Sequence, residues 1–239
     1  MARFLLIHGS AHGAWCWRDL LPEVAALGHS ATVIDLPGHG ADPTPYQDVT
    51  LDLYADHIVA TLRDIGAPTL LVGHSMGGYP ITLAADRCPE LIQHLVYLCA
   101  YVPKPGFSLN DRRREAPEQP LLPAIQLTGD GKGWRVAPDR IKDLFYHDCP
   151  PGTLEYALPR LCVQASQPSA QPVQTSDTSA QLPRSYIRCS DDRTIPPAYQ
   201  QTMTQDWPNN RVFTMHCGHS PFFADPAGLA RHLDMITKG

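Results

Sequence analysis

The sequence lacks the features that mark several specialised classes of protein. No apolar run approaches the ~20 residues that a membrane-spanning helix requires, and the apolar stretch after Arg3 is too short for a secretory signal peptide. No two of the seven cysteines have C-x-x-C spacing, which favours reduced, structural thiols over a disulfide framework. We therefore expect no contact with a membrane and, by default, a cytoplasmic location.

Metal-ligand spacing and excess positive charge are also missing. His216, Cys217 and His219 lie close together, but no second cluster completes a recognisable metal site, so we expect no metal. The net charge of −5 argues against a nucleic-acid partner, which requires a basic surface. We interpret the basic run Arg112–Arg114, which Glu115 follows, as a solvated loop rather than an anion site.

Strand-like and helix-like segments alternate in the N-terminal part of the chain. Apolar residues over 51–65 recur with helical spacing, and Gly66 follows as a helix stop. We expect further helices over 15–27 and 76–87, and strands over 3–8, 31–36, 69–72 and 91–101. Such alternation predicts an α/β fold with a mostly parallel central sheet and helices on both faces.

The pattern changes over 103–183, which is rich in Pro, Gln, Ser and Asp. We expect short helices over 138–145 and 153–162 and an irregular loop over 164–181. A disordered linker is the alternative, but the aromatic residues of the segment favour a folded cap, or lid. Beyond it we expect strands over 185–189 and 211–217 and helices over 198–207 and 226–236. The α/β core would thus comprise 1–102 and 184–239, with 103–183 as a cap insertion.

The segment Gly73–Gly78 fits the pattern G-x-S-x-G, with Ser75 at its centre. A predicted strand runs into this segment and a predicted helix leaves it. A serine on such a tight turn is held in strained geometry with its hydroxyl exposed, as a nucleophile requires. We therefore predict that Ser75 is a catalytic nucleophile.

A nucleophilic serine needs a base and an acid, which folds of this type place later in the chain in the order serine, acid, histidine. His219 follows the last predicted strand and is the expected base; His216 is a weaker second choice. Asp191 and Asp192 follow the strand over 185–189. We favour Asp192 as the acid because it lies four residues before Pro196, with Asp191 as the alternative.

An oxyanion hole needs two backbone N–H groups that point at the same position. Met76, which follows the nucleophile, is expected to supply one. Ser10, in the loop after the first strand, is expected to supply the other, and Gly9 lets the chain approach closely. Candidate substrate-binding residues are Gly9, Ala11, Trp134, Phe145 and Phe222.

Four segments of the sequence resemble the plant methylesterase and hydroxynitrile lyase family and its bacterial esterase relatives, which include pyrethroid-cleaving esterases. They are His8–Trp17, Asp35–Gly40, Gly73–Gly78 and Leu144–Cys149. This resemblance implies an α/β-hydrolase fold of the eight-stranded type with a small cap and no cofactor. It also implies a small-molecule ester as the substrate; a homodimer is one possible assembly.

The family contains two chemistries, and two positions help to separate them. Its lyases have threonine after the first histidine and lysine after the catalytic histidine, where this chain has Gly9 and Ser220. Both differences favour a serine carboxylic ester hydrolase acting on small or aromatic esters. The alternatives are a hydroxynitrile lyase or C–C bond hydrolase with the same triad, or a non-catalytic ligand-binding protein, because a fold alone does not fix function.

Overall fold

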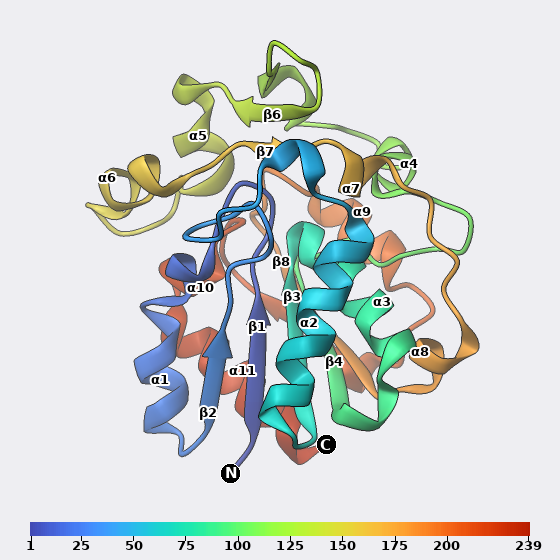
Figure 1. Ribbon diagram of the computed structural model, residues 1–239. Helices are drawn as coiled ribbons and strands as arrows, with labels where there is room; N and C mark the ends of the chain where they lie inside the picture. Colours follow the sequence, from blue (N-terminus) through green and yellow to red (C-terminus); the bar gives the residue numbers. More distant parts are fainter.

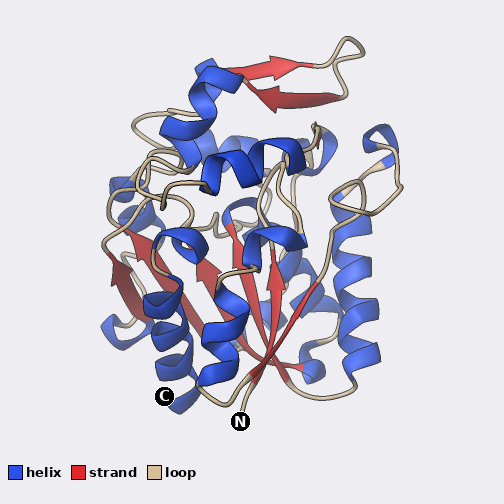
Figure 2. Cartoon of the chain, turned by 90° about the vertical axis from the view of Figure 1, so that its left-hand side faces the viewer, coloured by secondary structure: helices blue, strands red, loops and turns tan.

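A twisted parallel sheet forms the centre of the molecule, and helices cover both of its faces (Figures 1 and 2). The computed structural model describes residues 1–239, apart from the side chain of Asp177. The sheet has six strands in the order β2-β1-β3-β4-β8-β9, and every neighbouring pair is parallel. They are β1 (Arg3–Ile7), β2 (Ser30–Val33), β3 (Thr69–His74), β4 (Ile92–Leu98), β8 (Arg184–Cys189) and β9 (Val212–Met215).

Alternate residues of each strand pack against different layers of helices. On β1, Leu5 and Ile7 belong to one core cluster, whereas Phe4 and Leu6 belong to the other. The first cluster includes residues of α2 (Leu51–Ile65), α3 (Gly78–Arg87) and α9 (Pro197–Met203). The second includes residues of α1 (Leu20–Ala26), α10 (Pro221–Ala224) and α11 (Pro226–Lys238). Because side chains alternate between the two sides of a strand, both faces of the sheet are buried under helices.

Local signals in the sequence set the bounds of α2. The side chain of Thr50 accepts a hydrogen bond from the N–H of Leu53, which caps the first turn. Gly66 ends the helix in the left-handed region, at φ 63°, where a residue without a Cβ is favoured. The predicted helix over 51–65 is confirmed.

Between β4 and β8 the chain leaves the sheet and builds a separate layer above the carboxyl ends of the strands, opposite both chain termini (Figure 1). A small antiparallel sheet of β5 (Ile125–Leu127), β6 (Gly133–Val136) and β7 (Gln164–Ala165) lies in this segment. The helices of this layer are α4 (Leu109–Arg114), α5 (Pro138–Phe145), α6 (Thr153–Ala157) and α7 (Gln167–Ala170), whereas α8 (Asp177–Gln181) lies lower, beside α3 (Figure 1). We refer to residues 103–183 as the cap.

Two expectations about the cap are wrong. The predicted irregular loop over 164–181 contains β7, α7 and α8, whose lengths of two to five residues are too short for a periodic pattern. The predicted loop at Arg112–Arg114 is the end of α4. Ser108 caps α4 through a reciprocal pair of hydrogen bonds with Asp111, a signal that specifies a helix start.

Other differences from the sequence-based expectations concern the central sheet, the ends of elements, and short elements that were not expected, namely β5, β6 and α10 (Pro221–Ala224). The resemblance implies an eight-stranded sheet, whereas the sheet that the structure describes has six strands, with β1 next to the edge strand β2. The helix expected over 15–27 divides into a 3-10 turn at Ala14–Trp17 and α1. In the part of the chain that the structure describes, no helix is long and apolar enough to cross a membrane.

Candidate active site

Ser75 lies on the sharp turn between β3 and α3, one short 3-10 turn (Ser75–Gly77) before the helix. Its φ of 55° is in the left-handed region, which non-glycine residues seldom occupy. The backbone around it is close-packed: a Cβ on Gly78 would lie 2.1 Å from the carbonyl oxygen of Tyr101. A Cβ on Gly73 would lie 2.6 Å from the carbonyl oxygen of Gly77. Only glycine fits at these two positions, of which Gly73 is the first glycine of the G-x-S-x-G pattern and Gly78 directly follows the last.

Strand order brings the loops after β1 and β3 together. The chain passes from β1 to β2 on one side, whereas β3 pairs with β1 on the other side. Ligands of open α/β sheets bind at such a switch point, beyond the carboxyl ends of the strands. Gly9, in the loop after β1, lies directly against the nucleophile turn, since a Cβ there would be 2.9 Å from the Cβ of Ser75.

A continuous chain of hydrogen bonds joins Ser75, His219 and Asp192. The Oγ of Ser75 lies 3.1 Å from Nε2 of His219, and Nδ1 of His219 lies 2.8 Å from Oδ2 of Asp192. All three residues are buried. In this arrangement the imidazole donates to the carboxylate through Nδ1 and is left with Nε2 as the acceptor for the serine hydroxyl.

The Asp192 carboxylate is fully hydrogen bonded although it is buried. Its Oδ1 accepts from the backbone N–H groups of Thr194 (2.7 Å) and Ile195 (2.9 Å). Its Oδ2 accepts from Gln200 Nε2 (2.9 Å) on α9 and from His219. Asp191, the alternative acid, is exposed and belongs to no such network among the described residues. These donors make a buried charge tolerable and fix the carboxylate in place.

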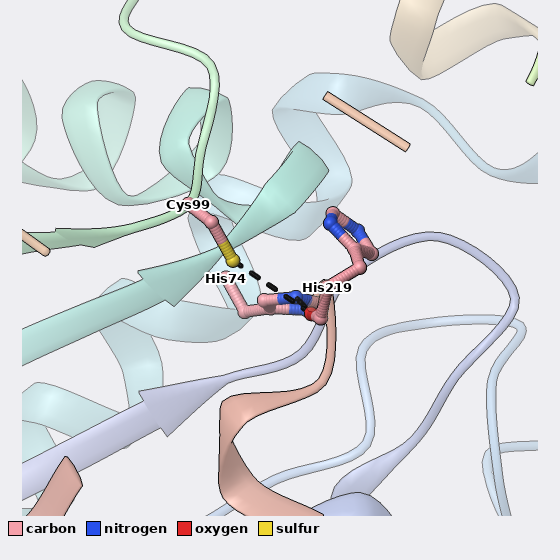
Figure 3. Close-up of side chains that lie close together, drawn as sticks. All are labelled: His74, Cys99 and His219. Carbon is pink, nitrogen blue, oxygen red and sulfur yellow. Dashed lines mark hydrogen bonds between the residues drawn. The ribbon is translucent and has the colours of Figure 1, made fainter. Parts of the chain in front are cut away.

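His74 and Cys99 support the backbone of His219. Figure 3 shows both side chains directed at the His219 carbonyl oxygen, which accepts from His74 Nε2 at 2.8 Å and from Cys99 Sγ at 3.7 Å. Potential metal ligands of these three residues lie within 4.8 Å of one another. Both ring nitrogens of His219 are already engaged, however, and burial raises the pKa of the Cys99 thiol to about 12. The donor set therefore fits a hydrogen-bonding role rather than metal binding.

A cavity of about 210 Å³ opens above Ser75 and is covered by the cap. Ser75 and His219 line it, as do Ser10 and Met76, the predicted sources of the two oxyanion N–H groups. Trp134 also lines it, and the remainder of the wall that the cap supplies is largely apolar: Leu109, Leu121, Leu122, Ile125, Leu127 and Phe145. The cavity therefore suits a small, mainly apolar substrate placed against the nucleophile.

Buried histidine rings hold the carbonyl groups of the loop after β1. His8 Nδ1 donates to the carbonyl of Gly9 (2.9 Å), and His12 Nδ1 donates to that of Ser10 (2.8 Å). His39 Nδ1 donates to the carbonyl of His12 at 2.7 Å. Because these carbonyl oxygens are hydrogen bonded, the peptide planes of the loop cannot rotate freely. The directions of the N–H groups of the loop are therefore fixed before a ligand binds.

These rings are held in their neutral form. Burial lowers the pKa of His12 and that of His39 to about 4, and it lowers the pKa values of His8 and His74 well below the ordinary 6.5. Desolvation is the largest cause in each case, and neighbouring histidines lower the pKa values of His8 and His74 further. Neutral rings with one donor and one acceptor match the observed hydrogen bonds.

Residues of the cap form hydrogen bonds with the loop after β1 and with the loop after β9, which carries His219. Tyr146 donates from its hydroxyl to Nε2 of His12 (2.7 Å), and Asp148 accepts from the N–H of Gly218 (2.5 Å), beside His219. Gln164 on β7 accepts from the N–H of Ala11 at 2.9 Å. The segment Leu144–Cys149, which resembles known proteins in sequence, thus connects the loop after β1 with the loop after β9 that carries His219.

The predicted substrate-binding residues divide into two groups. Trp134 and Phe145 line the cavity, and the Phe145 ring stacks on His219 with centroids 5.9 Å apart. Ala11 instead lines a separate pocket of about 180 Å³ behind Phe145. Phe222 is instead fully buried, with its ring centroid 5.0 Å from that of His74. Its place on α10, a helix absent from our prediction, directs it into the core.

Several residues around the site were not singled out by sequence reasoning. Gln200 and Gln164 were missed because a glutamine outside a motif carries no local signal. His12 and Tyr146 lie inside the quoted segments, so their presence in the site could have been anticipated, although not their mutual hydrogen bond. All seven cysteines are free thiols, in agreement with the prediction from their spacing.

The fold and this site define an α/β hydrolase. Residues 4–232 match the family model described as "Alpha/beta hydrolase family", and the chain belongs to that family.

Within the family, the chain groups with the plant methylesterases. It is 30% identical to Methylesterase 1 of Arabidopsis thaliana, over 98% of this chain and 95% of that protein. It is 28% identical to Methyl jasmonate esterase 1 of Vitis vinifera, over 98% and 93% of the two chains. The crystal structure of a pyrethroid hydrolase from Sphingobium faniae is similar, with a TM-score of 0.87, 25% identity, and coverage of 99% of this chain and 97% of that chain.

The two neighbouring aspartates provide a matched test of the acid. Asp192→Asn should lower kcat by on the order of 10⁴-fold, because an amide in place of the carboxylate favours the wrong imidazole tautomer. Asp191→Asn, at an exposed position, should change kcat by no more than a few-fold. Steady-state kinetics with one activated ester would compare them, and equal losses or the reverse order would contradict the assignment.

The buried neutral histidines predict a loss of stability in mild acid. Their folded-state pKa values lie below the unfolded value of 6.5, so below that pH the unfolded chain binds protons that the folded chain does not. The free energy of unfolding should fall as pH drops from 6.5 towards 4, by about 1 kcal/mol per such histidine between pH 6.5 and 5.5. Urea unfolding between about pH 6.5 and 5.5, where ordinary carboxylates stay ionised, would measure it. A free energy of unfolding that stays constant or rises as the pH falls would contradict the assignment of these histidines as neutral.

Proposed function

We propose that this protein is a serine hydrolase that cleaves carboxylic esters through an acyl-enzyme. The observation that carries the proposal is the unbroken Ser75–His219–Asp192 hydrogen-bond chain on a strained turn beneath a cavity. The names of the methylesterase and esterase relatives support the same reaction. They also suggest methyl esters as substrates to test.

In the proposed reaction, Ser75 Oγ attacks the ester carbonyl carbon while His219 Nε2 takes the hydroxyl proton. The negative charge that develops on the carbonyl oxygen is met by the backbone N–H groups of Ser10 and Met76. His219 then returns its proton to the departing alkoxide, which leaves as the alcohol. Water repeats the sequence on the acyl-enzyme and releases the carboxylic acid.

Asp192 does not take the proton in this scheme. It holds the imidazole in the required tautomer and stabilises the imidazolium that forms. The residues argued to act through others, rather than on the substrate, are His12, His74, Cys99, Tyr146 and Gln164. The proposed chemistry requires no cofactor or metal. A cytoplasmic location and a homodimer stay predictions from the sequence.

Removal of the nucleophile is the direct test of this proposal. Ser75→Ala should lower kcat for 4-nitrophenyl acetate by on the order of 10⁴-fold or more and leave the fold intact. Ser190→Ala, which changes a serine outside the cavity, is the matched control. An organophosphate should label Ser75 in the unchanged protein, as read by peptide mass. Turnover that survives Ser75→Ala would overturn the proposal and favour a non-catalytic ligand-binding protein with an adventitious activity.

Hydroxynitrile lyase chemistry is the main alternative, and the packing around Gly9 disfavours it. The lyases of the resemblance carry threonine at this position, but a Cβ on Gly9 would lie 2.8 Å from Nδ1 of His74. Ser220, at the position of their lysine, is buried and neutral. At these two positions the chain therefore lacks the side chains that hold the hydroxyl and the departing cyanide of a cyanohydrin in the lyases.

We accordingly expect negligible cleavage of mandelonitrile beside measurable ester hydrolysis. Benzaldehyde release would be followed at about pH 5, where the uncatalysed reaction is slow, with ester hydrolysis measured at about pH 8. Rapid benzaldehyde release that Ser75→Ala abolishes would identify a lyase. A C–C bond hydrolase would instead cleave an activated diketone faster than the matched ester.

A further inference from the structure

The three consecutive arginines of α4 have different environments. Arg112 pairs with Glu115, and its Nε donates to the carbonyl of Val102 at 3.1 Å. Arg114 pairs with Asp111 at 2.8 Å. Arg113 lines the active-site cavity, and among the described side chains it forms no ion pair. Its Nε is buried and has no hydrogen-bond partner.

The helix fixes which arginine faces the cavity. Residues four apart share a helix face, so Arg113 lies above Leu109, which also lines the cavity. The capping box between Ser108 and Asp111 sets where the helix starts and therefore its rotation. Arg113 is thus directed to the cavity by local structure rather than by an opposing carboxylate.

The charge of Arg113 is left uncompensated within the site. Burial lowers the pKa of its guanidinium, which means that the charged form has lost part of its hydration. The nearby Tyr101 phenol does not neutralise it, because burial raises the pKa of Tyr101 far above neutral pH. The residues that line the cavity include no Asp or Glu. An anion that entered the cavity would meet a poorly hydrated guanidinium and no lining carboxylate.

We propose that Arg113 binds a carboxylate carried by the substrate, so that the preferred esters have an apolar middle and a free carboxylate at the end remote from Ser75. Half-esters of aliphatic dicarboxylic acids have this form. The guanidinium fork matches a carboxylate in shape and charge. The apolar residues of the cap suit the middle of such a substrate, and Ser166 and Ser169 are further polar residues of the lining. The proposal rests on the ester hydrolase function proposed above.

The test compares two probes that differ only in charge. Mono-4-nitrophenyl adipate ends in a carboxylate, and 4-nitrophenyl adipamate ends in the isosteric neutral carboxamide. The unchanged protein should have the higher kcat/KM for the acid. Arg113→Met should lower the acid-to-amide ratio of kcat/KM by about 10- to 100-fold, as expected for loss of a charge-assisted hydrogen-bonded pair. Arg113→Lys should retain part of the preference.

Arg114→Met is the matched control, because it removes one positive charge from the same helix outside the cavity. It should leave the acid-to-amide ratio unchanged. Parallel losses for both probes in Arg113→Met would indicate a merely structural role and overturn the proposal. So would the absence of a preference in the unchanged protein, or an equal effect of Arg114→Met.

A binding measurement separates this proposal from the proposed catalysis. Calorimetry with monomethyl adipate on the Ser75→Ala protein needs no turnover. Adding Arg113→Met should weaken binding by about tenfold or more, and unchanged affinity would overturn the role of Arg113. If neither nitrophenyl probe is hydrolysed in a Ser75-dependent way, the ester hydrolase proposal fails, and the calorimetric result still decides the role of Arg113.

Discussion

Asp192 carries a negative charge where water does not reach it, and the surrounding structure is arranged to satisfy that charge. Two backbone N–H groups, Gln200 and His219 supply its hydrogen bonds. Loss of one of these partners would leave a buried carboxylate incompletely hydrogen bonded, which would be strongly destabilising. The carboxylate therefore fixes the relative positions of three segments: the loop after β8, α9 and the loop after β9. The orientation of His219, and through it the alignment with Ser75, depends on this buried pair.

The cap takes part in the same network and does more than cover the cavity. Tyr146, Asp148 and Gln164 donate to or accept from the loops after β1 and β9. Displacement of the cap would therefore remove hydrogen-bond partners from both loops, as well as exposing the cavity. The buried histidines extend this coupling into the core, because His8 and His12 bond backbone carbonyls of the loop after β1 and His74 bonds the backbone carbonyl of His219.

Local signals explain which parts of the fold and site could be predicted. The helix over 51–65 has a cap, an amphipathic period and a glycine stop within its own sequence. The positions of Ser75, Asp192 and His219 could be predicted because each follows a strand, and parallel strands end at one edge of the sheet. Gln164 and Ala11, in contrast, are 153 residues apart, and their contact depends on where the cap folds back.

Arg113 illustrates the same limit. A run of arginines followed by a glutamate is typical of a solvated surface. Arg113 differs from Arg112 and Arg114 only in the side of α4 on which it lies, and the sequence alone does not show which side faces the cavity. The burial of Phe222 could not be predicted for a similar reason, since α10 spans only Pro221–Ala224 and leaves no periodic pattern to identify.

The most direct test of the central claim is a crystal structure of the protein inhibited by a small alkyl phosphonate. The account predicts a covalent bond from phosphorus to Ser75 Oγ, with the phosphoryl oxygen within hydrogen-bond distance of the backbone N–H groups of Ser10 and Met76. His219 Nε2 would lie beside the Ser75 oxygen and remain bonded to Asp192. An adduct on any other residue, or a phosphoryl oxygen that points away from both N–H groups, would contradict it.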